Sequence, residues 1–340
     1  RDVPALGESP ASRAIACGFV CARVLCARTT CPTRTRPHPT PPRGRKVLRL
    51  TVFTRSSFLA CGVAAQLTQH VMLNASAAAA CALSMSTSMQ AEDVLMLPTL
   101  LAGTRGKPGT FVELGAFDGV KFSNTLMLEK CFGWQGLLIE ANPESFAKLN
   151  ASTRTAHKLY SAVCAAATRP PTVRITLDGG TTAGDITRLS KGRQQRRAGR
   201  AVDVPCRPLQ ELMAAYGLDG ADLLSLDVEG SEDSVLATVR PAAFRVTLVE
   251  DNGASEVAVR RMLADGGLHP ARMLQVMFSS VWVRPGVAEL RVPAVFPPKV
   301  ACRGCPPGGA WVADGKKPTV LHRDLRNAIL EAHTMARRAA

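Results

Sequence analysis

The sequence predicts an α/β fold in which helices cover both faces of a mostly parallel sheet. Short apolar runs, as found in buried strands, alternate with segments of helical periodicity. The first such unit has an apolar run at 111–114, a turn with Gly115 and Gly119, a helix over 122–131 and a second apolar run at 137–139. This order of strand, glycine turn, helix and strand is typical of a βαβ unit that binds a nucleotide.

The acidic residues of this first unit indicate what kind of nucleoside it holds. Glu140 ends the second apolar run about two dozen residues after the glycines begin, the spacing at which such units place a carboxylate for ribose hydroxyls. Glu113 and Asp118 flank the glycines, in a Glu-x-Gly-x-x-x-Gly turn that differs from the Gly-x-Gly-x-x-Gly of dinucleotide binders. Acids there disfavour a pyrophosphate and suit a cation such as the sulfonium and amino group of S-adenosylmethionine, because opposite charges attract most where water is partly excluded.

Several motifs in this chain resemble the FkbM-type S-adenosylmethionine-dependent methyltransferases. They are Phe-Val-Glu-Leu-Gly-Ala-Phe-Asp-Gly at 111–119, Phe-Ser-Asn-Thr at 122–125, Gly-Trp-Gln-Gly-Leu-Leu-Ile-Glu-Ala-Asn-Pro at 133–143 and Leu-Leu-Ser-Leu-Asp-Val-Glu-Gly-Ser-Glu at 223–232. The resemblance covers roughly residues 109–284. It implies a class I methyltransferase Rossmann-like fold with a seven-stranded sheet, S-adenosyl-L-methionine as cofactor, and O-methylation of a hydroxyl on a small molecule or glycan.

The apolar patterns place the later elements of the domain. Further strands are expected at 158–163, 172–177, 202–204, 222–227, 245–249 and, as one or two terminal strands, within 273–283. Further helices are expected at 92–101, 143–149, 209–216, 231–239, 256–264 and 321–338. Residues 178–200 have no apolar period and are expected to form a long loop.

Acidic residues follow the carboxyl ends of the predicted strands, which is where ligands of open α/β sheets bind. We expect Asp227 to take the proton from the acceptor, with Glu229 or Glu250 as the alternative base. A structural role is the competing interpretation, since Asp227 could cap a helix and Glu250 could pair with an arginine. The expected cofactor-binding residues are Glu113, Gly115, Ala116, Asp118, Gly119, Asn124, Glu140, Ala141, Asn142, Ala162, Val163 and Asp227.

No residue is assigned as a metal ligand. An alternative places a divalent ion on Asp227, Asp251 and Asn252, because acids after the fourth and fifth strands resemble the magnesium site of catechol O-methyltransferase. The pair Cys302 and Cys305 forms a lone Cys-x-x-Cys, and without a second pair close by it does not indicate zinc.

The sequence predicts three regions. Residues 1–90 form a basic leader for targeting or without stable structure, 91–288 the methyltransferase domain, and 289–340 a Pro/Gly-rich segment with a basic C-terminal helix. The leader is rich in Arg and Ser and has no acid from 9 to 91, a composition typical of import into a plastid or mitochondrion. The alternative is a membrane anchor over 58–83 in the secretory pathway, although several polar residues interrupt that run.

The eleven cysteines are interpreted as unpaired. Six lie in the leader, and those in the domain stand singly in apolar surroundings, which is typical of buried thiols in a reducing compartment. No disulfide framework is expected.

The basic residues of the loop expected at 178–200 indicate which class of acceptor the protein binds. Six Arg or Lys residues between 188 and 200 indicate either a solvated loop or an anionic acceptor, such as a phosphorylated or sulfated sugar. Nucleic acid is disfavoured, because no aromatic residue is interleaved to stack on bases. The alternative function is a non-catalytic cargo-binding protein of membrane traffic, since the domain also resembles that of the protein Star. An anchor at 58–83 would favour that alternative.

Overall fold

The computed structural model describes most of the chain from residue 74 onward. The described residues are 74–105, 107–165, 172–177, 183–185, 200–250, 255–274, 276–277, 279–297, 299–301, 310–312 and 317–338. All of the described residues belong to one compact unit, 74–340. Within these residues no helix is long and apolar enough to cross a membrane. Most of the segment expected as an anchor, 58–83, lies outside them.

The main sheet has seven strands in the order β10-β11-β9-β8-β1-β2-β3. Strands β3, β2, β1, β8 and β9 run parallel, while β11 is antiparallel to both of its neighbours, so that β10 has the common direction again. This arrangement confirms the predicted mostly parallel, Rossmann-like sheet. The strands are β1 (Thr110–Leu114), β2 (Gln135–Glu140), β3 (His157–Tyr160), β8 (Ala221–Leu226), β9 (Phe244–Glu250), β10 (His269–Pro270) and β11 (Ser279–Val283).

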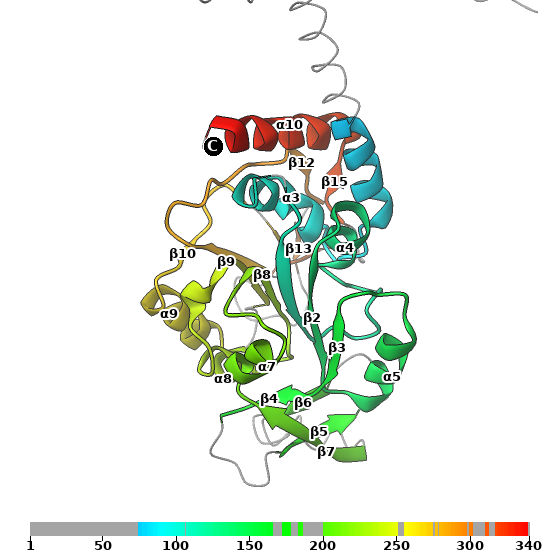
Figure 1. Cartoon of the computed structure of the whole chain (residues 1–340), viewed down its shortest axis with the longest axis vertical. Coiled ribbons are helices and arrows are strands. Elements are labelled where there is room, and N and C mark those ends of the chain that lie inside the picture. The colour runs from blue at the N-terminus through cyan, green and yellow to red at the C-terminus, as the bar shows by residue number, and fades with distance from the viewer. Residues whose placement is uncertain are drawn as a thin grey trace, which may run out of the picture. The chain divides into compact units, whose positions relative to one another are not determined.

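Alternation along the central strands divides the core between the two faces of the sheet. Phe111 and Leu223 pack into one core, and their neighbours Val112 and Leu224 into the other, because successive strand residues point to opposite faces. The first core is covered by α3 (Glu92–Gly103), α4 (Leu126–Phe132), α5 (Pro143–Ala151) and α10 (His322–Arg338). The second is covered by α7 (Leu209–Ala215), α8 (Glu232–Leu236) and α9 (Glu256–Asp265) (Figure 1).

The compact unit extends beyond the domain expected at 91–288 at both ends. Residues 74–85 are helical, and Ala75, Ala79 and Ala82 on that helix are fully buried in the first core. At the other end, α10 lies across α3 (Figure 1) and buries Leu325 and Ile329, which confirms the predicted C-terminal helix and gives it a packing role.

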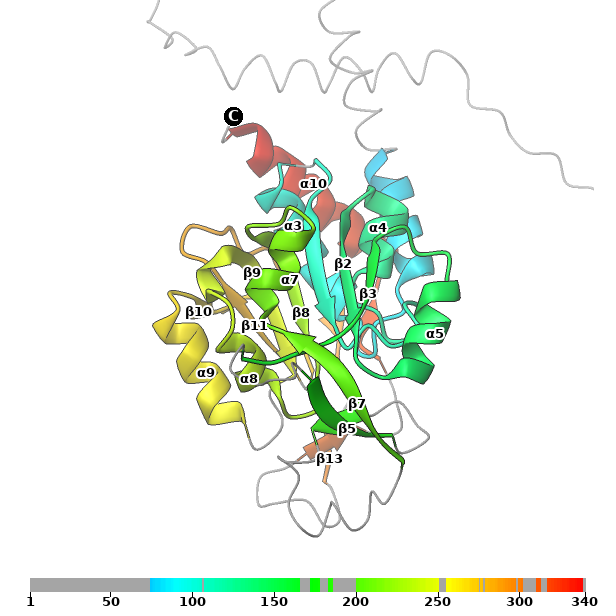
Figure 2. The ribbon, with the colours of Figure 1, turned by 60° about the horizontal axis from the view of Figure 1, so that its bottom comes forward.

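A second, four-stranded sheet lies beyond the carboxyl end of β3 (Figure 2) and was not predicted. Its strands are β4 (Ala162–Val163), β5 (Thr172–Leu177), β6 (Ala183–Asp185) and β7 (Arg200–Arg207), in the order β4-β7-β5-β6. The single strand expected at 158–163 is wrong, because it breaks at Ser161, whose hydroxyl donates to the carbonyl of Pro205 in β7. Strand β6 lies inside the segment 178–200 that was expected to be loop throughout.

The described structure also has two short strand pairs and one isolated bridge. Strand β12 (Ala294–Val295) pairs with β15 (Thr319–Val320), and β13 (Lys299–Ala301) pairs with β14 (Ala310–Val312). Ser88 forms an isolated bridge with Phe122, and this bridge brings the segment before α3 against the turn after β1.

Among the described residues, two disulfides correct the interpretation of the domain cysteines as unpaired thiols. Cys81 bonds to Cys131 and Cys164 bonds to Cys206. The paired cysteines are 50 and 42 residues apart in sequence, so no local cysteine spacing predicts these disulfides. Disulfides form and persist where conditions are oxidising, and the argument for a reducing compartment therefore loses its basis.

We predict that the variant carrying Cys81→Ser and Cys131→Ser is less stable than the wild type by about 2–4 kcal/mol, because the disulfide closes a loop of 50 residues in the unfolded chain. The bond joins the helix at 74–85 to α4 (Leu126–Phe132), so that helix should also become more open to proteolysis. Urea unfolding of both proteins in an oxidising buffer checks the first effect. Equal midpoints and equal slopes would show that packing alone holds the helix.

Candidate functional site

A pocket of about 340 Å³ lies at the carboxyl ends of β1, β2 and β8, the edge of the sheet at which open α/β folds bind their ligands. One wall comes from the ends of these strands and includes Gly115, Glu140 and Asp227. The opposite wall comes from the second sheet and includes Val163 and Ile175. The pocket therefore lies between two sheets rather than within one.

Gly115 brings two strand ends into contact. Its φ of +74° lies in the left-handed region, and a Cβ at this position would stand 1.9 Å from the carbonyl oxygen of Asp227. The N–H groups of Gly115 and Ala116 both donate to the carbonyl of Ile139 at 3.1 Å. Glycine is therefore required for steric and conformational reasons, and the turn after β1 is fixed to β2 and β8 together.

Glu140 holds the same turn from the end of β2. Its two carboxylate oxygens accept from the N–H of Phe117 and the N–H of Asn142, each at 2.7 Å. Burial raises the pKa of Glu140 to about 7, and the hydrogen bonds from the backbone oppose that shift. The N–H of Ala141 also contributes to that opposing effect. A carboxylate has about four acceptor positions, so Glu140 can still accept from a ligand hydroxyl in the pocket.

Glu113 is placed differently from Glu140, although both are buried strand acids. One oxygen accepts from the N–H of Asn124 at 2.7 Å, and the other accepts from the hydroxyls of Ser123 and Thr125. These bonds hold 122–125 as an irregular loop. The helix expected from 122 begins only at Leu126 for that reason.

Arg154 anchors this loop from beneath. Its side chain is fully buried, and its Nε donates to Glu129 of α4 at 2.8 Å, while its other nitrogens donate to the carbonyl of Gly119 and to the hydroxyls of Ser123 and Thr125. Burial by itself would raise the pKa of Glu129. The N–H of Thr155 and the guanidinium of Arg154 outweigh burial and lower that pKa to about 2.

Asn124 offers an unsatisfied acceptor at the pocket. It lines the pocket, and its Nδ2 donates to the hydroxyl of Ser225 at 3.0 Å. Its Oδ1 is buried and has no hydrogen-bond partner within the protein. Because a buried polar atom without a partner costs free energy, a donor on a bound ligand would stabilise this side chain.

Three acids meet where β8 and β9 end. Asp227 and Glu229 line the pocket, and Glu250 hydrogen-bonds to Asp227. Asp227 is an exposed residue that lines the pocket. Its pKa is raised well above the usual value, first because the surrounding protein atoms displace part of its water and then because Glu250 is a negative neighbour. Glu229, with φ at +56°, adds to the shift.

Glu232 is a structural residue of the site that sequence reasoning missed. One of its oxygens accepts from the N–H groups of Val228 and Gly230, and the other accepts from the hydroxyl of Ser255. The turn that carries Asp227 is thus fixed from within. The cluster of acids at 227–232 was a signal of this role, since an acid just after a tight turn can accept its free N–H groups.

The apolar part of the lining was also missed. Phe117 and Phe122 line the pocket with φ values of +49° and +64°, which are uncommon for residues other than glycine. Met89 lines it from the segment before α3, and Val173 lines it from β5. No sequence signal links these positions, because they come together only through the tertiary fold.

Most of the expected site residues lie together in the pocket. Those that line it are Glu113, Gly115, Asn124, Glu140, Ala141, Ala162, Val163, Asp227 and Glu229. Ala116, Gly119 and Glu250 do not line it, although Glu250 contacts Asp227. Asp118 accepts from the N–H groups of Val120 and Lys121, and Asn142 caps α5; both support the turns around the site.

Two expected features lie outside the described residues. They are the alternative metal ligands Asp251 and Asn252, and the basic residues between 188 and 199. Among the residues that the structure describes, no group of three or more His, Cys, Asp or Glu side chains is arranged to hold a metal ion.

Residues 113–268, a little under half of the chain, match the family model described as the methyltransferase FkbM domain. No curated protein matches the chain. One similar solved structure is fibrillarin of Aeropyrum pernix in complex with natively bound S-adenosyl-L-methionine, with 13% identity and a TM-score of 0.31 over 55% of this chain and 72% of that one. Another is precorrin-6y C5,15-methyltransferase of Geobacter metallireducens GS-15, with 10% identity and a TM-score of 0.29 over 54% of this chain and 85% of that one.

Likeness at this level to the two solved structures carries no argument about what this chain binds or methylates. The family match confirms, over residues 113–268, the resemblance found in the sequence.

We predict that Gly115→Ala destabilises the protein more than Gly217→Ala, although both glycines have a φ near +74°. The strain of the left-handed backbone, about 1–2 kcal/mol, is common to both variants. Only at Gly115 does the new methyl group also meet a carbonyl oxygen, whereas nothing lies within 4 Å at Gly217. Urea unfolding of the two variants checks this, and equal losses would refute the close approach to Asp227.

We predict that Arg154→Met costs about 3–5 kcal/mol at pH 7, because it removes the buried cation beside Glu129 and leaves that carboxylate only the partly exposed ammonium of Lys130. The pKa of Glu129 is lowered on folding, so its contribution to stability is complete above about pH 4.5 and is lost as the pH falls toward 2. That acid-dependent loss should shrink in the variant. Urea unfolding between pH 2 and 7 measures both effects.

Arg261→Met is the matched control for Arg154→Met. Arg261 also pairs with an acid, Asp265, but both side chains are largely exposed. Its loss should change stability by less than about 0.5 kcal/mol. A similar effect from both variants would contradict the anchoring role of Arg154.

Proposed function

We propose, from the FkbM-type methyltransferase domain that residues 113–268 form, that this chain transfers a methyl group from S-adenosylmethionine to a hydroxyl of a small molecule or glycan. The observation that supports this most is the pocket itself. It places Glu140, the unsatisfied oxygen of Asn124 and the acid Asp227 around one cavity inside the matched domain.

The residues present fit such a cofactor. Glu140 stands at the end of β2 with acceptor capacity for ribose hydroxyls. Gly115 lets the backbone approach closely, and Asn124 Oδ1 is an acceptor for an ammonium group. Bound there, S-adenosylmethionine supplies a methyl group already activated on a sulfonium.

Asp227 would remove the proton from the acceptor hydroxyl. A carboxyl group whose pKa is raised above its usual value is a stronger base than an ordinary carboxylate. Glu250 shares a hydrogen bond with it, so the proton would be held by the pair rather than by either residue alone. Glu229 is the alternative base at the same rim of the pocket.

The acceptor is proposed from the charge of this rim. A neutral hydroxyl fits beside Asp227, whereas an anionic group placed there would be repelled by several carboxylates. The anionic acceptor expected from the basic loop stays a prediction, because residues 188–199 of that loop are outside the described structure.

We predict that the full-length chain binds S-adenosylhomocysteine and that Glu140→Ala weakens this binding by at least about tenfold, because the ribose loses its acceptor. Wild-type affinity should rise from pH 6 to pH 8 by up to about tenfold, since the pKa of Glu140 is about 7 and hydroxyl donors favour the carboxylate. The variant should show only the pH dependence of the ligand's own groups. Titration calorimetry at several pH values measures each affinity.

Glu211→Ala is the control for Glu140→Ala, because Glu211 is an exposed acid on α7 and does not line the pocket. It should bind as the wild type does. Circular dichroism must show that each variant is folded. A folded wild-type chain that binds neither S-adenosylmethionine nor S-adenosylhomocysteine would refute the proposal and leave the Star-like cargo binder as the better interpretation.

A further inference from the structure

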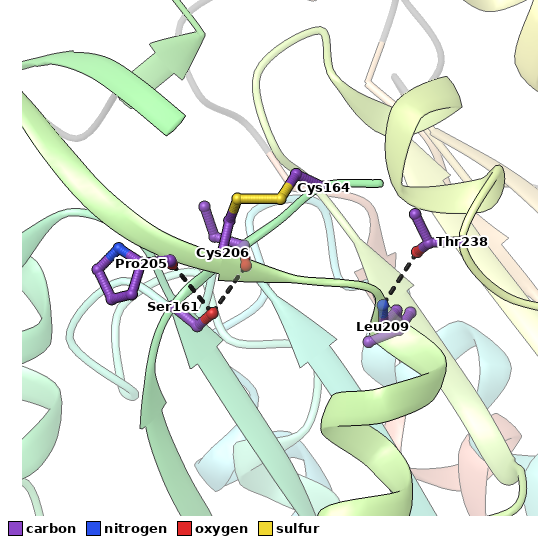
Figure 3. The surroundings of a disulfide bond; sticks show 7 residues. Ser161, Cys164, Pro205, Cys206, Leu209 and Thr238 are labelled. Atoms are coloured by element: carbon purple, nitrogen blue, oxygen red, sulfur yellow. Dashed lines mark hydrogen bonds between the residues drawn. A yellow bond between two sulfur atoms is a disulfide. The ribbon is translucent and has the colours of Figure 1, made fainter. Parts of the chain in front are cut away.

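One disulfide forms part of the pocket wall. Cys164 follows β4 and lines the pocket between Val163 and Ala165, while Cys206 on β7 is 1% exposed (Figure 3). A reagent that enters the pocket therefore reaches the sulfur of Cys164 before that of Cys206. The other disulfide, Cys81–Cys131, contributes neither of its residues to the pocket.

The non-covalent attachment of β4 within this wall is slight. The strand has two residues and pairs with β7 only through Ala162 and Val163, flanked by hydrogen bonds from Cys164 N to the carbonyl of Arg207 and from the Ser161 hydroxyl to the carbonyl of Pro205. The second sheet has its own core of just three buried side chains, Ile175, Leu177 and Val204, among the described residues. Isolated short strand pairs with so small a core are marginal in water.

The disulfide joins this weakly held wall to a firmly held element. Three residues after Cys206, the chain enters α7, where the N–H of Leu209 donates to the hydroxyl of Thr238 at 3.0 Å (Figure 3). Thr238 follows Ala237, which lines the pocket from the end of α8. The Cys164–Cys206 bond therefore links two segments that line the pocket, the one after β4 and the one at the end of α8.

We propose that Cys164–Cys206 is a redox-modification site whose state sets the affinity of the pocket for the adenosyl cofactor, an inference that rests on the proposed function. The reductant is a dithiol. One of its thiolates attacks Cys164 Sγ, the bond between the two cysteine sulfurs breaks, and Cys206 leaves as a thiolate that takes up a proton. The second thiolate of the dithiol then attacks the dithiol sulfur that is bonded to Cys164, and Cys164 is released as a thiol. Two electrons and two protons have then passed to the cysteines, and the dithiol has become a disulfide.

Coupling of this kind is reciprocal. If the oxidised wall binds the ligand more tightly, the bound ligand must favour the oxidised wall by the same factor. The ligand also covers the pocket side of Cys164, from which the dithiol arrives. Ligand should therefore slow the reduction of Cys164–Cys206 and leave the reduction of Cys81–Cys131 unchanged.

The test is calorimetric titration of S-adenosylhomocysteine into the full-length oxidised protein, the dithiothreitol-reduced protein and the variant carrying Cys164→Ser and Cys206→Ser. We expect the last two to bind about 5- to 150-fold more weakly than the first, the usual range of coupling between sites. The variant carrying Cys81→Ser and Cys131→Ser is the control for lost stability, and it should keep the affinity of the oxidised wild type. All titrations are made well below the melting temperature of the least stable protein.

A second measurement does not depend on affinity. Mass spectrometry of alkylated samples, taken at intervals after dithiothreitol is added with and without S-adenosylhomocysteine, gives the reduction rate of each disulfide. Equal affinities in the oxidised and reduced proteins, or reduction of Cys164–Cys206 that the ligand does not slow, would overturn this inference alone. No binding by the folded, oxidised chain would overturn the proposed function and this inference with it.

Discussion

The pocket depends on one buried cation. Arg154 is the fully buried guanidinium on which the turn after β1, the loop at 122–125 and the start of α4 all converge. Two carboxylates, Glu113 and Glu129, lie beside it without access to water. A carboxylate in such surroundings is tolerated only with a cation or several donors, so the irregular backbone around the pocket keeps one shape because its alternatives would leave these charges unpaired.

The two walls of the pocket differ in how firmly they are held. The wall built on the main sheet is fixed by strand pairing on both sides, by Gly115 against Asp227, and by carboxylates that accept backbone N–H groups. In the wall built on the second sheet, β4 is held to β7 by a two-residue ladder and by the Cys164–Cys206 bond, and the sheet has a small core among the described residues. When conditions change, the part of a structure with the fewest stabilising contacts opens first.

The sequence predicts the elements that have a periodic apolar pattern. It does not predict features that depend on a contact with a residue far away in the sequence. The strand patterns, the glycine turn and the acid that ends β2 follow from local rules, and the parallel sheet then brings the strand-end acids to one edge. The break at Ser161 depends on Pro205, the delayed start of α4 on Glu113, and the disulfides on pairs more than forty residues apart. In none of these cases does the local sequence around the affected residue indicate its distant partner.

Residue type at a strand end therefore says little about the role of an acid until its partners are known. Glu113, Glu140 and Asp227 all lie at or next to the carboxyl ends of strands of one sheet, and all line one pocket. The oxygens of Glu113 accept from loop donors, those of Glu140 accept from backbone N–H groups, and Asp227 lines the cavity next to another carboxyl group. Moving from the first to the third, the carboxyl group changes from a structural acceptor to a group free to exchange a proton, and so the chemistry of the site should be sought at the end of β8 rather than at the glycine turn.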